Sequence, residues 1–321
     1  MDPQRHYLEF ERPIGELEAK IEELSRLSET NGDGGFESEI VSLRARIAQM
    51  RREAYANLDP WQKTQVARHP ERPHFSHYVR ALIEGFEELR GDRQFADDQA
   101  IVGGLGRFRG QPVVAIGHEK GHDTTTRIKH NFGMARPEGY RKAVRLMDLA
   151  ERYGLPVLTF VDTAGAYPGL GAEERGQAEA IARSTERCLT LSTPMVATIT
   201  GEGGSGGAIA LAGANRVLIL EHSTYSVISP EAGSSILFRD REQAPHMAAA
   251  MKIVATDLIK SGVVDRIIPE PPGGAHSDPE TAIQGVGDAV EEELKALANM
   301  SPDALRAQRA DRFYAIGRTF R

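Results

Sequence analysis

Apolar residues recur every three to four positions in two stretches near the N-terminus. One stretch covers residues 14–27 and the other covers residues 38–58, and each carries one narrow apolar stripe between charged positions, as surface helices do. The glycine-rich segment Asn31-Gly32-Asp33-Gly34-Gly35 separates them. The pattern predicts an antiparallel helical hairpin over residues 1–58. This arm either packs as an ordinary helix pair or grips a partner subunit.

Residues 59–98 are predicted to form a helical lead-in. Asp59 followed by Pro60 is an N-cap and first-turn pair, and residues 76–89 have the apolar spacing of a second helix. Residues 91–98 combine polar and glycine positions in the manner of a loop. We therefore expect two short helices and a loop before the core begins.

The pattern changes from residue 99 onward. Short apolar runs rich in β-branched residues now alternate with helix-like stretches, which is typical of a layered α/β core. We place this core at residues 99–268. The predicted strands cover residues 113–116, 157–161, 196–200, 217–220 and 224–228, and the predicted helices cover residues 139–153, 172–191 and 206–213.

The last segment, residues 269–321, is predicted to close the fold with helices. Residues 269–279 form a connector rich in proline and glycine. A helix is expected over residues 280–300. Ser301 with Pro302 is a second N-cap and first-turn pair, which predicts a final helix up to residue 316.

Composition limits the classes of partner. Charged residues make up 26% of the 321 residues and the net charge is −7, so bulk electrostatics gives no reason to expect nucleic acid or an acidic membrane surface. No apolar run approaches the length of a membrane span, and the N-terminus lacks the apolar region of a secretory signal. We expect a soluble, cytoplasmic protein. The single cysteine, Cys188, is expected to be a packed residue rather than a nucleophile.

The segment 194–213 carries the strongest candidate chemistry. A buried type of β-run leads into a glycine-rich turn and then into a helix of small residues. Glycines there let the backbone approach a ligand closely, and the free N–H groups of the first helical turn attract negative charge. The sequence therefore predicts an anion-binding site built from backbone. Its glycines are Gly201, Gly203, Gly204, Gly206 and Gly207.

Two nucleotide-binding motifs offer competing interpretations. The stretch 201–206 fits G-x-G-x-x-G, and Glu221 follows near the spacing of a ribose contact, so an NAD(P)-dependent Rossmann enzyme is an alternative. The predicted helix after Gly206 is short for a Rossmann crossover. Asp162-Thr163-Ala164-Gly165 resembles a GTPase loop, but the sequence lacks the G-x-x-x-x-G-K-[ST] cradle that such an enzyme requires.

A third motif, His118-Glu119-Lys120-Gly121-His122, matches the H-E-x-x-H pattern of zinc proteases. Zinc chemistry needs both histidines on one helical face. Here a strand is predicted over residues 111–117, and Gly117 and Gly121 both disfavour a helix. We therefore interpret the motif as a polar loop that leaves a strand, and we expect no metal in this chain.

No nucleophilic triad is predicted either, because Ser205 in the glycine turn has no identifiable histidine base. A reaction in which the substrate or cofactor supplies the base, and the protein supplies oriented N–H donors, suits the sequence better. Enolate and ureido-anion chemistry is of this kind.

Several long blocks of sequence, taken in order, resemble the alpha subunit of the carboxyltransferase component of bacterial and plastid acetyl-CoA carboxylase. The blocks cover residues 85–108, 127–169, 172–183, 201–213, 223–231 and 267–276. The resemblance implies an α/β fold with a crotonase-like (ClpP/crotonase) ββα spiral core between the N-terminal hairpin and the C-terminal helices. It also implies transfer of a carboxyl group from carboxybiotin on a carrier protein to acetyl-CoA, which gives malonyl-CoA for fatty acid synthesis.

The same resemblance implies the site residues. Gly206 and Gly207 would be catalytic, because their backbone N–H groups would hold the oxyanion of the biotin ureido group. Residues that shape the turn or contact the cofactor would be Gly203, Gly204, Gly165 and Ala166. Carboxybiotin, carried on a partner protein, would be the cofactor, without a metal in this chain. The family reads DTPGAYPG where this chain has Ala164 in place of the proline.

The partners implied are a carboxyltransferase beta subunit in an α2β2 assembly, the biotin carboxyl carrier protein, biotin carboxylase and acetyl-CoA. Neither a membrane nor nucleic acid is expected. One alternative stays open beside the Rossmann enzyme: a non-catalytic scaffold subunit of the same fold, whose glycine turn only packs a helix against a sheet.

Overall fold

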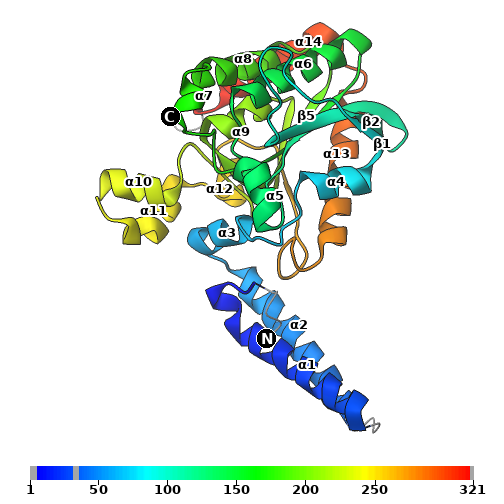
Figure 1. The fold of residues 1–321 in the computed structure, drawn as a ribbon, viewed down its shortest axis with the longest axis vertical. Coiled ribbons are helices and arrows are strands. Elements are labelled where there is room, and N and C mark those ends of the chain that lie inside the picture. The colour runs from blue at the N-terminus through cyan, green and yellow to red at the C-terminus, as the bar shows by residue number, and fades with distance from the viewer. Residues whose placement is uncertain (1–5, 32–35, 319–321) are drawn as a thin grey trace.

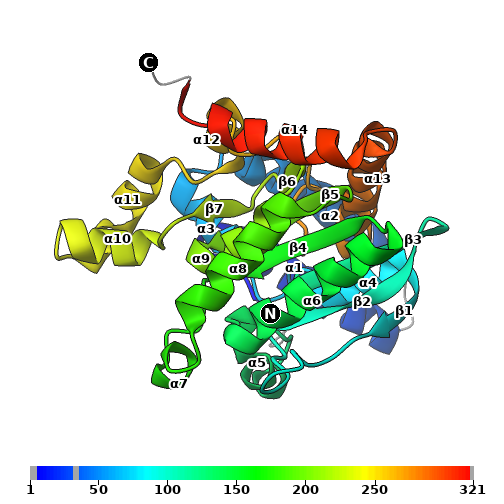
Figure 2. The same ribbon diagram turned by 90° about the horizontal axis from the view of Figure 1, so that it is seen from above.

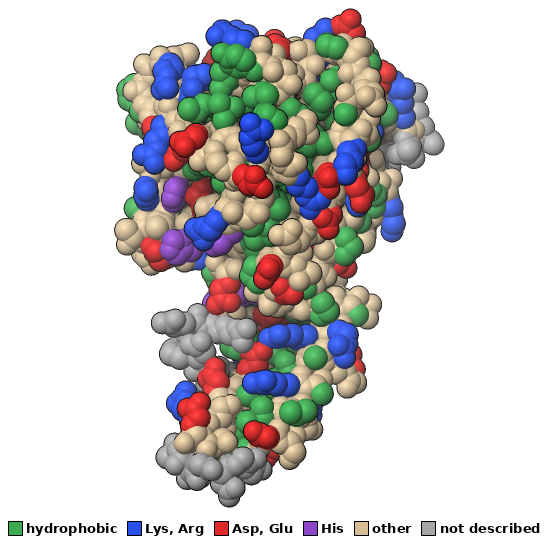
Figure 3. Space-filling model, turned by 90° about the vertical axis from the view of Figure 1, so that its right-hand side faces the viewer, with side chains coloured by type: hydrophobic (Ala, Val, Ile, Leu, Met, Phe, Trp, Pro, Cys, Tyr) green, Lys and Arg blue, Asp and Glu red, His purple; other side chains and the backbone are tan. Residues whose placement is uncertain are grey.

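The computed structural model describes residues 6–31 and 36–318 of the chain. Its N-terminal part is a helical hairpin that projects from a globular core (Figure 1). A short 3-10 helix, η1 (Glu9–Glu11), leads into α1 (Arg12–Asn31), and α2 (Glu37–Ala56) returns beside it. The predicted arm is therefore present, whereas most of the glycine turn expected between its helices, residues 32–35, lies outside the described residues. Acidic and basic side chains intermingle on its exposed face (Figure 3).

In the lead-in, residues 59–98, the structure agrees with the prediction for the first helix but not for the second. Helix α3 (Pro60–Ala67) begins as expected, because the Asp59 carboxylate accepts a hydrogen bond of 2.8 Å from the Gln62 N–H. Helix α4 (Phe75–Leu82) is shorter than predicted, and β1 (Ile83–Glu88) follows it directly. The helix predicted to residue 89 is thus wrong over residues 83–89. Gly85 has φ +59°, which interrupts a helix, and β1 pairs antiparallel with the next strand.

One mixed sheet forms the centre of the core, in the order β1-β2-β3-β4-β5-β6-β8. The antiparallel end contains β1, β2 and β3, and the strands from β3 to β8 run parallel. A short strand, β7, pairs with the far end of β5. The strands not yet given are β2 (Ile101–Phe108), β3 (Gln111–His118), β4 (Val157–Thr163), β5 (Met195–Gly204), β6 (Arg216–Leu220), β7 (Thr224–Ser226) and β8 (Arg266–Ile268).

Helices cover both faces of this sheet (Figure 2). One apolar cluster joins the sheet to α6 (Pro137–Tyr153), α8 (Gln177–Thr190) and α9 (Ser205–Ala212). A second cluster joins the opposite face to α4 and α13 (Pro279–Leu297). Strands β4 and β5 are buried along their whole length, which is why their sequences read as continuous apolar runs rather than as alternating ones.

Smaller helices surround these layers. They are α5 (Thr124–Lys129), η3 (Asn131–Gly133), α7 (Leu170–Glu173), α10 (Pro230–Leu237), η4 (Arg241–Gln243), α11 (Ala244–Met251) and α12 (Ala255–Lys260). The single helix predicted over residues 172–191 is divided, because Gly176 has φ +81° between α7 and α8. Helices α10 and α11 project from one side of the core (Figure 2).

The C-terminal helices match their predictions closely. Helix α14 (Pro302–Ala315) begins where the Ser301 hydroxyl accepts a hydrogen bond from the Ala304 N–H. Cys188 is fully buried, and burial raises the pKa of its thiol to about 12, as suits a packed residue rather than a nucleophile. Among the described residues, no helix has the length and apolar character needed to cross a membrane.

Candidate functional site

The glycine-rich segment forms the junction between β5 and α9. Sequence patterning placed five glycines in a turn, but the strand continues through Gly204 and the helix begins at Ser205. The chain therefore changes from strand to helix at a single residue, Ser205. Ser205 has φ +52°, a strained conformation for a residue with a side chain. The turn is shorter and sharper than the sequence suggested.

The spacing of Gly203-Gly204-Ser205-Gly206-Gly207 is that of a nucleophile elbow, G-x-S-x-G, which the sequence analysis did not recognise. The cavities that adjoin Ser205 are lined by no histidine among the described residues. A serine without a base is not an activated nucleophile. The strained backbone at Ser205 instead directs the start of α9, with the N–H groups of Gly206 and Gly207 in its first turn.

Two close backbone contacts hold the loop after β4 against this helix start. A Cβ atom on Gly207 would stand 2.7 Å from the carbonyl carbon of Gly165 and 3.0 Å from the nitrogen of Ala166. A Cβ atom on Gly204 would stand 2.2 Å from the carbonyl oxygen of Ala164. Real side chains do not reach such distances, so both positions require glycine. The structure thus brings Gly165 and Ala166 together with the glycines of the turn.

Gly206, unlike Gly204 and Gly207, has room for a Cβ atom. A Cβ atom there would contact the side chain of Ile181 at 3.4 Å, which is ordinary packing. Gly206 also borders a cavity of about 660 Å³ between the β4 loop and α10, and Gly165 and Ala166 line the same cavity. The N–H groups of the first turn of a helix have no intrahelical acceptor. The helix start at this cavity can therefore receive an anion.

Gly203 supports the turn from the other side of the strand. Its Cβ position would lie 3.1 Å from the ring of Tyr225 on β7, and Gly203 pairs with Tyr225 in the sheet. A larger residue at Gly203 would press on β7 rather than on the cavity. Of the glycines expected to shape the site, Gly204 and Gly207 thus adjoin the β4 loop, whereas Gly203 packs against the sheet.

Arg68 ties the lead-in to both walls of this cavity. Its guanidinium donates to the Glu202 carboxylate from Nε at 2.8 Å and from Nη2 at 2.6 Å, and from Nη1 to Glu231 at 2.5 Å. Burial opposes ionisation of Glu231, but hydrogen bonds from Arg68 hold its pKa below the usual value. Arg68 thereby joins the end of α3, the end of β5 and the start of α10.

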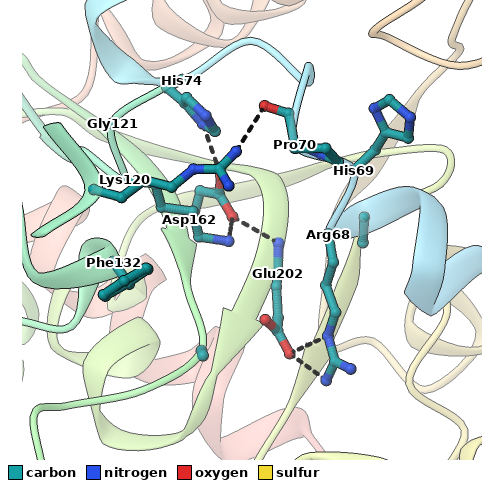
Figure 4. A pocket seen from close by; sticks show the side chains of 12 residues that line it. Arg68, His69, Pro70, His74, Lys120, Gly121, Phe132, Asp162 and Glu202 are labelled. Atoms are coloured by element: carbon teal, nitrogen blue, oxygen red, sulfur yellow. Dashed lines mark hydrogen bonds and ion pairs between the residues drawn. The ribbon is translucent and has the colours of Figure 1, made fainter. Parts of the chain in front are cut away.

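A second, smaller cavity of about 210 Å³ lies beside the first and shares Arg68, Ala164 and Glu202 with it. Figure 4 shows the buried carboxylate of Asp162 between Lys120 and His74. Lys120 Nζ is 2.6 Å from Asp162 Oδ1, and the Glu202 N–H donates to the same oxygen at 2.9 Å. Burial opposes ionisation of Asp162, yet Lys120 and His74 hold its pKa well below the usual range.

The H-E-x-x-H motif does not form a zinc site. His118 ends β3 and is buried, Glu119 accepts hydrogen bonds from the N–H groups of Ser76 and Gly121, and His122 is exposed. The motif therefore leaves a strand, as predicted, and its histidines do not share a helical face. Burial lowers the pKa of His118 to about 4, so its ring is neutral near pH 7.

Within residues 6–31 and 36–318, one other group has the residue types of a metal site: Glu11, His69 and His276, near the base of the arm. His69 Nε2 lies 2.8 Å from the carbonyl oxygen of His6, and its Nδ1 accepts from the Glu71 N–H at 3.3 Å. Both nitrogens of His69 are thus engaged. The rings of His69 and His276 stack at 3.7 Å with 16° between their planes, so their lone pairs do not converge on one ion.

The structure also argues against the Rossmann alternative, which required Glu221 as a ribose contact. The Glu221 carboxylate accepts a hydrogen bond from the Glu270 N–H, in the connector that follows β8, rather than facing the glycine turn. Sequence reasoning did not identify Arg68 or His74, and it named Lys120 only as part of the H-E-x-x-H motif. Each lies far along the chain from the turn, and isolated basic residues in the lead-in and in the loop after β3 carry no local signal.

Comparison with known proteins gives a consistent result. The sequence matches the family described as acetyl co-enzyme A carboxylase carboxyltransferase-like over residues 7–317. It is 77% identical, over 98% of both chains, to the acetyl-coenzyme A carboxylase carboxyl transferase subunit alpha of Caulobacter vibrioides NA1000. It is 64% identical to the protein of the same name from Methylobacterium nodulans, over 98% of this chain and 99% of the relative.

Solved structures support the fold. The transcarboxylase 12S structure superposes with a TM-score of 0.58 at 14% identity, over 71% of this chain and 42% of that one. The geranyl-CoA carboxylase beta subunit of P. aeruginosa gives a TM-score of 0.56 at 17% identity, over 77% and 46%. This chain thus spans less than half of either neighbour. The likeness shows a crotonase-like core, in agreement with the fold expected from sequence.

Proposed function

This chain belongs to the family of acetyl-CoA carboxylase carboxyltransferase alpha subunits, and on that premise we propose that the Gly206-Gly207 helix start stabilises the ureido anion of biotin during carboxyl transfer. The chain is a carboxyltransferase subunit of acetyl-CoA carboxylase. The proposal adds two points. The carboxyl donor is carboxybiotin on a carrier protein, and the backbone N–H groups of Gly206 and Gly207 stabilise its ureido anion.

The contact between Gly207 and Gly165 carries the proposal. It places the first turn of α9 and the β4 loop at one wall of the 660 Å³ cavity. Backbone donors there are fixed before the reaction, so they need no reorganisation when charge develops. Two such donors contribute about 3 kcal/mol each in comparable oxyanion holes.

Bound carboxybiotin would supply the carboxyl group and, once that group has left, a ureido nitrogen able to accept the proton of the acetyl methyl. Atoms balance, because the methyl loses one proton to the biotin nitrogen and gains the carboxyl group, which yields malonyl-CoA and biotin. The residues of this chain need only orient the ureido oxygen and exclude water. This division of roles suits cavity walls without an activated nucleophile.

A partner is part of the proposal. Departure of the carboxyl group leaves one anion on biotin, and loss of a methyl proton forms a second, the enolate, on acetyl-CoA, whereas the turn at Gly206 offers one set of donors. We infer that a beta subunit of similar fold supplies the second set, in an α2β2 assembly, and that the biotin carboxyl carrier protein and biotin carboxylase deliver and reload the carboxyl group.

The direct test is reconstitution. The purified chain, a beta subunit and carrier protein charged with ¹⁴C-carboxybiotin are mixed with acetyl-CoA, and label in malonyl-CoA is measured. We expect label only when both chains are present. Transfer at the full rate by this chain alone would contradict the two-subunit mechanism, and no transfer by the complete mixture would contradict the assigned donor.

A further inference from the structure

We propose that the 210 Å³ cavity beside the glycine turn binds the free carboxylate of the malonyl group, with Arg127 and His74 as its recognition residues. This inference rests on the proposed function and extends it to the product. The cavity shares Arg68, Ala164 and Glu202 with the cavity at Gly206. A carboxylate held in the smaller cavity would therefore lie next to the biotin site from which it came.

The balance of charge in the cavity favours an anion. Its lining contains three cations, Arg68, Lys120 and Arg127. Arg68 is paired with Glu202 and Glu231, and Lys120 with Asp162. Within the described ranges 6–31 and 36–318, Arg127 has no carboxylate partner, and the hydrogen bond found for its side chain is a long one of 3.5 Å from Nη2 to the Pro70 carbonyl oxygen.

An unpaired guanidinium is suited to this ligand. It presents five N–H donors in a fixed plane, and two of them match the two oxygens of a carboxylate. Arg127 is half-buried on α5, so its pairing with an anion is screened less than that of a fully exposed arginine. The lining thus offers a guanidinium that no carboxylate of the described residues pairs with and that makes only the long hydrogen bond to Pro70.

His74 supplies the independent observation. Its residue is 5% exposed, and neither ring nitrogen has a hydrogen-bond partner among the described residues. Nδ1 faces Asp162, whose Oδ2 lies 3.6 Å away at ion-pair distance, so Nε2 is the ring nitrogen with no partner of either kind among the described residues. His74 lines the cavity, and Figure 4 shows its ring directed toward Asp162, with a dashed line for the ion pair between them. A buried polar nitrogen without a partner is costly, and a carboxylate oxygen in the cavity would accept from it.

The opposite wall is held in strained backbone. Asn131 and Phe132 have φ of +48° and +56°, and the half-exposed ring of Phe132 lines the cavity. Two consecutive non-glycine residues in this region cost free energy that the surrounding fold must offset, as is common at ligand sites. The volume is below the range of about 300 to 1,000 Å³ typical of whole small-molecule sites. It suits a carboxylate group rather than an entire cofactor.

Malonyl carboxylate and free bicarbonate share this chemistry, so the experiment separates them. Arg127→Gln, Arg127→Lys and the control Lys129→Gln are each assembled with a beta subunit. Lys129 is exposed on the same helix and lines neither the 210 Å³ cavity nor the cavities that adjoin Ser205. The KM for malonyl-CoA in the reverse reaction and the KM for acetyl-CoA in the forward reaction are measured, with malonate and bicarbonate as competing probes.

We expect Arg127→Gln to raise the KM for malonyl-CoA about tenfold or more, as for one charge-assisted contact, with the KM for acetyl-CoA within about twofold. Arg127→Lys should recover part of the loss, and Lys129→Gln should behave as the unmodified chain. Malonate should compete with malonyl-CoA in the unmodified complex and much less in Arg127→Gln. His74→Phe, which keeps an aromatic ring but removes both nitrogens, should show the same selective effect.

Three results would overturn the inference. An equal rise in both KM values would mean that Arg127 contacts the part shared by the two CoA esters. Unchanged KM values in Arg127→Gln would mean that the cavity binds no carboxylate. Competition by bicarbonate without competition by malonate would assign the cavity to free bicarbonate. Failure of the biotin site is distinguishable, because it would appear as unmodified turnover in an assembled Gly207→Ala complex, whatever Arg127 does.

Discussion

Gly207 and Gly165 approach each other so closely that a Cβ atom on Gly207 would stand 2.7 Å from the carbonyl carbon of Gly165. The first belongs to the start of α9 and the second to the loop after β4. The contact fixes the spacing between two backbone segments at the wall of one cavity. The geometry of the candidate anion site therefore depends on the absence of a side chain at Gly207 more than at Gly206.

Gly206→Ala tests that distinction. The added methyl would meet Ile181 at 3.4 Å, which is normal contact, so we expect unfolding free energy within about 0.5 kcal/mol of the unmodified chain and turnover reduced by less than about tenfold. Urea unfolding and malonyl-CoA formation measure the two quantities. A loss of more than about a hundredfold in a stable, assembled variant would mean that the Gly206 Cβ position itself faces the anion.

The buried ion pair between Arg72 and Glu270 should dominate acid stability of the lead-in. Both side chains are almost fully buried and their charged groups are 2.5 Å apart. Burial opposes ionisation of Glu270, but Arg72 lowers its pKa from 4.5 to about 2. The folded state thus binds fewer protons than the unfolded state between these values, and this stabilisation is complete above pH 4.5 and is lost as the pH falls toward 2.

Glu270→Gln checks this expectation by urea unfolding at several pH values. It leaves the Arg72 charge buried without its partner, so we expect a loss of about 3 kcal/mol at pH 7. The difference from the unmodified chain should shrink between pH 4.5 and pH 2. Glu280→Gln, at an exposed position, is the control. A difference that does not change with pH would show that ionisation of Glu270 does not stabilise the fold.

We expect the chain to bind no stoichiometric metal. His118 and His122 do not converge, and both nitrogens of His69 are engaged within the fold. Elemental analysis of protein purified without chelators measures the content directly. One zinc per chain that survives dialysis would contradict this expectation, and loss of that zinc in His276→Ala would place it at the base of the arm.

Much of the fold could be predicted because its elements carry local signals. Strands β4 and β5 are buried on both faces and read as continuous apolar runs, and Ser301 marks the start of α14. Strand β2 escaped because it is rich in glycine. Its glycines are imposed by packing, since a Cβ atom on Gly104 would lie 2.0 Å from the carbonyl oxygen of Glu87 on β1. Such a requirement is visible only once the two strands are paired.

The candidate site also has a part that could be predicted from the sequence and a part that could not. The backbone part could be located from sequence, because glycines between a strand and a helix are a local pattern, although the elbow spacing around Ser205 was overlooked. The side-chain part could not. Arg68, at the end of α3, forms ion pairs with Glu202 and Glu231. Lys120 follows β3 and forms an ion pair with Asp162 on the neighbouring strand β4. The parallel pairing of β3 with β4 brings Lys120 to Asp162, and the packing of α3 against β5 brings Arg68 to Glu202.

The most direct test of the central claim compares Gly207→Ala with Gly213→Ala in the reconstituted complex. Both substitutions place a Cβ atom 2.7 Å from a neighbour, Gly165 in the first case and Cys188 in the second, at opposite ends of α9. Only Gly207 adjoins the β4 loop at the anion cavity. Turnover per assembled complex is measured by transfer of label from carboxybiotin to acetyl-CoA, with thermal unfolding as the measure of stability. We predict that both variants lose stability, that Gly207→Ala lowers turnover by about two to three powers of ten, and that Gly213→Ala keeps turnover within about threefold. Unmodified turnover in an assembled Gly207→Ala complex would contradict the assignment and leave the turn a packing feature of a scaffold subunit.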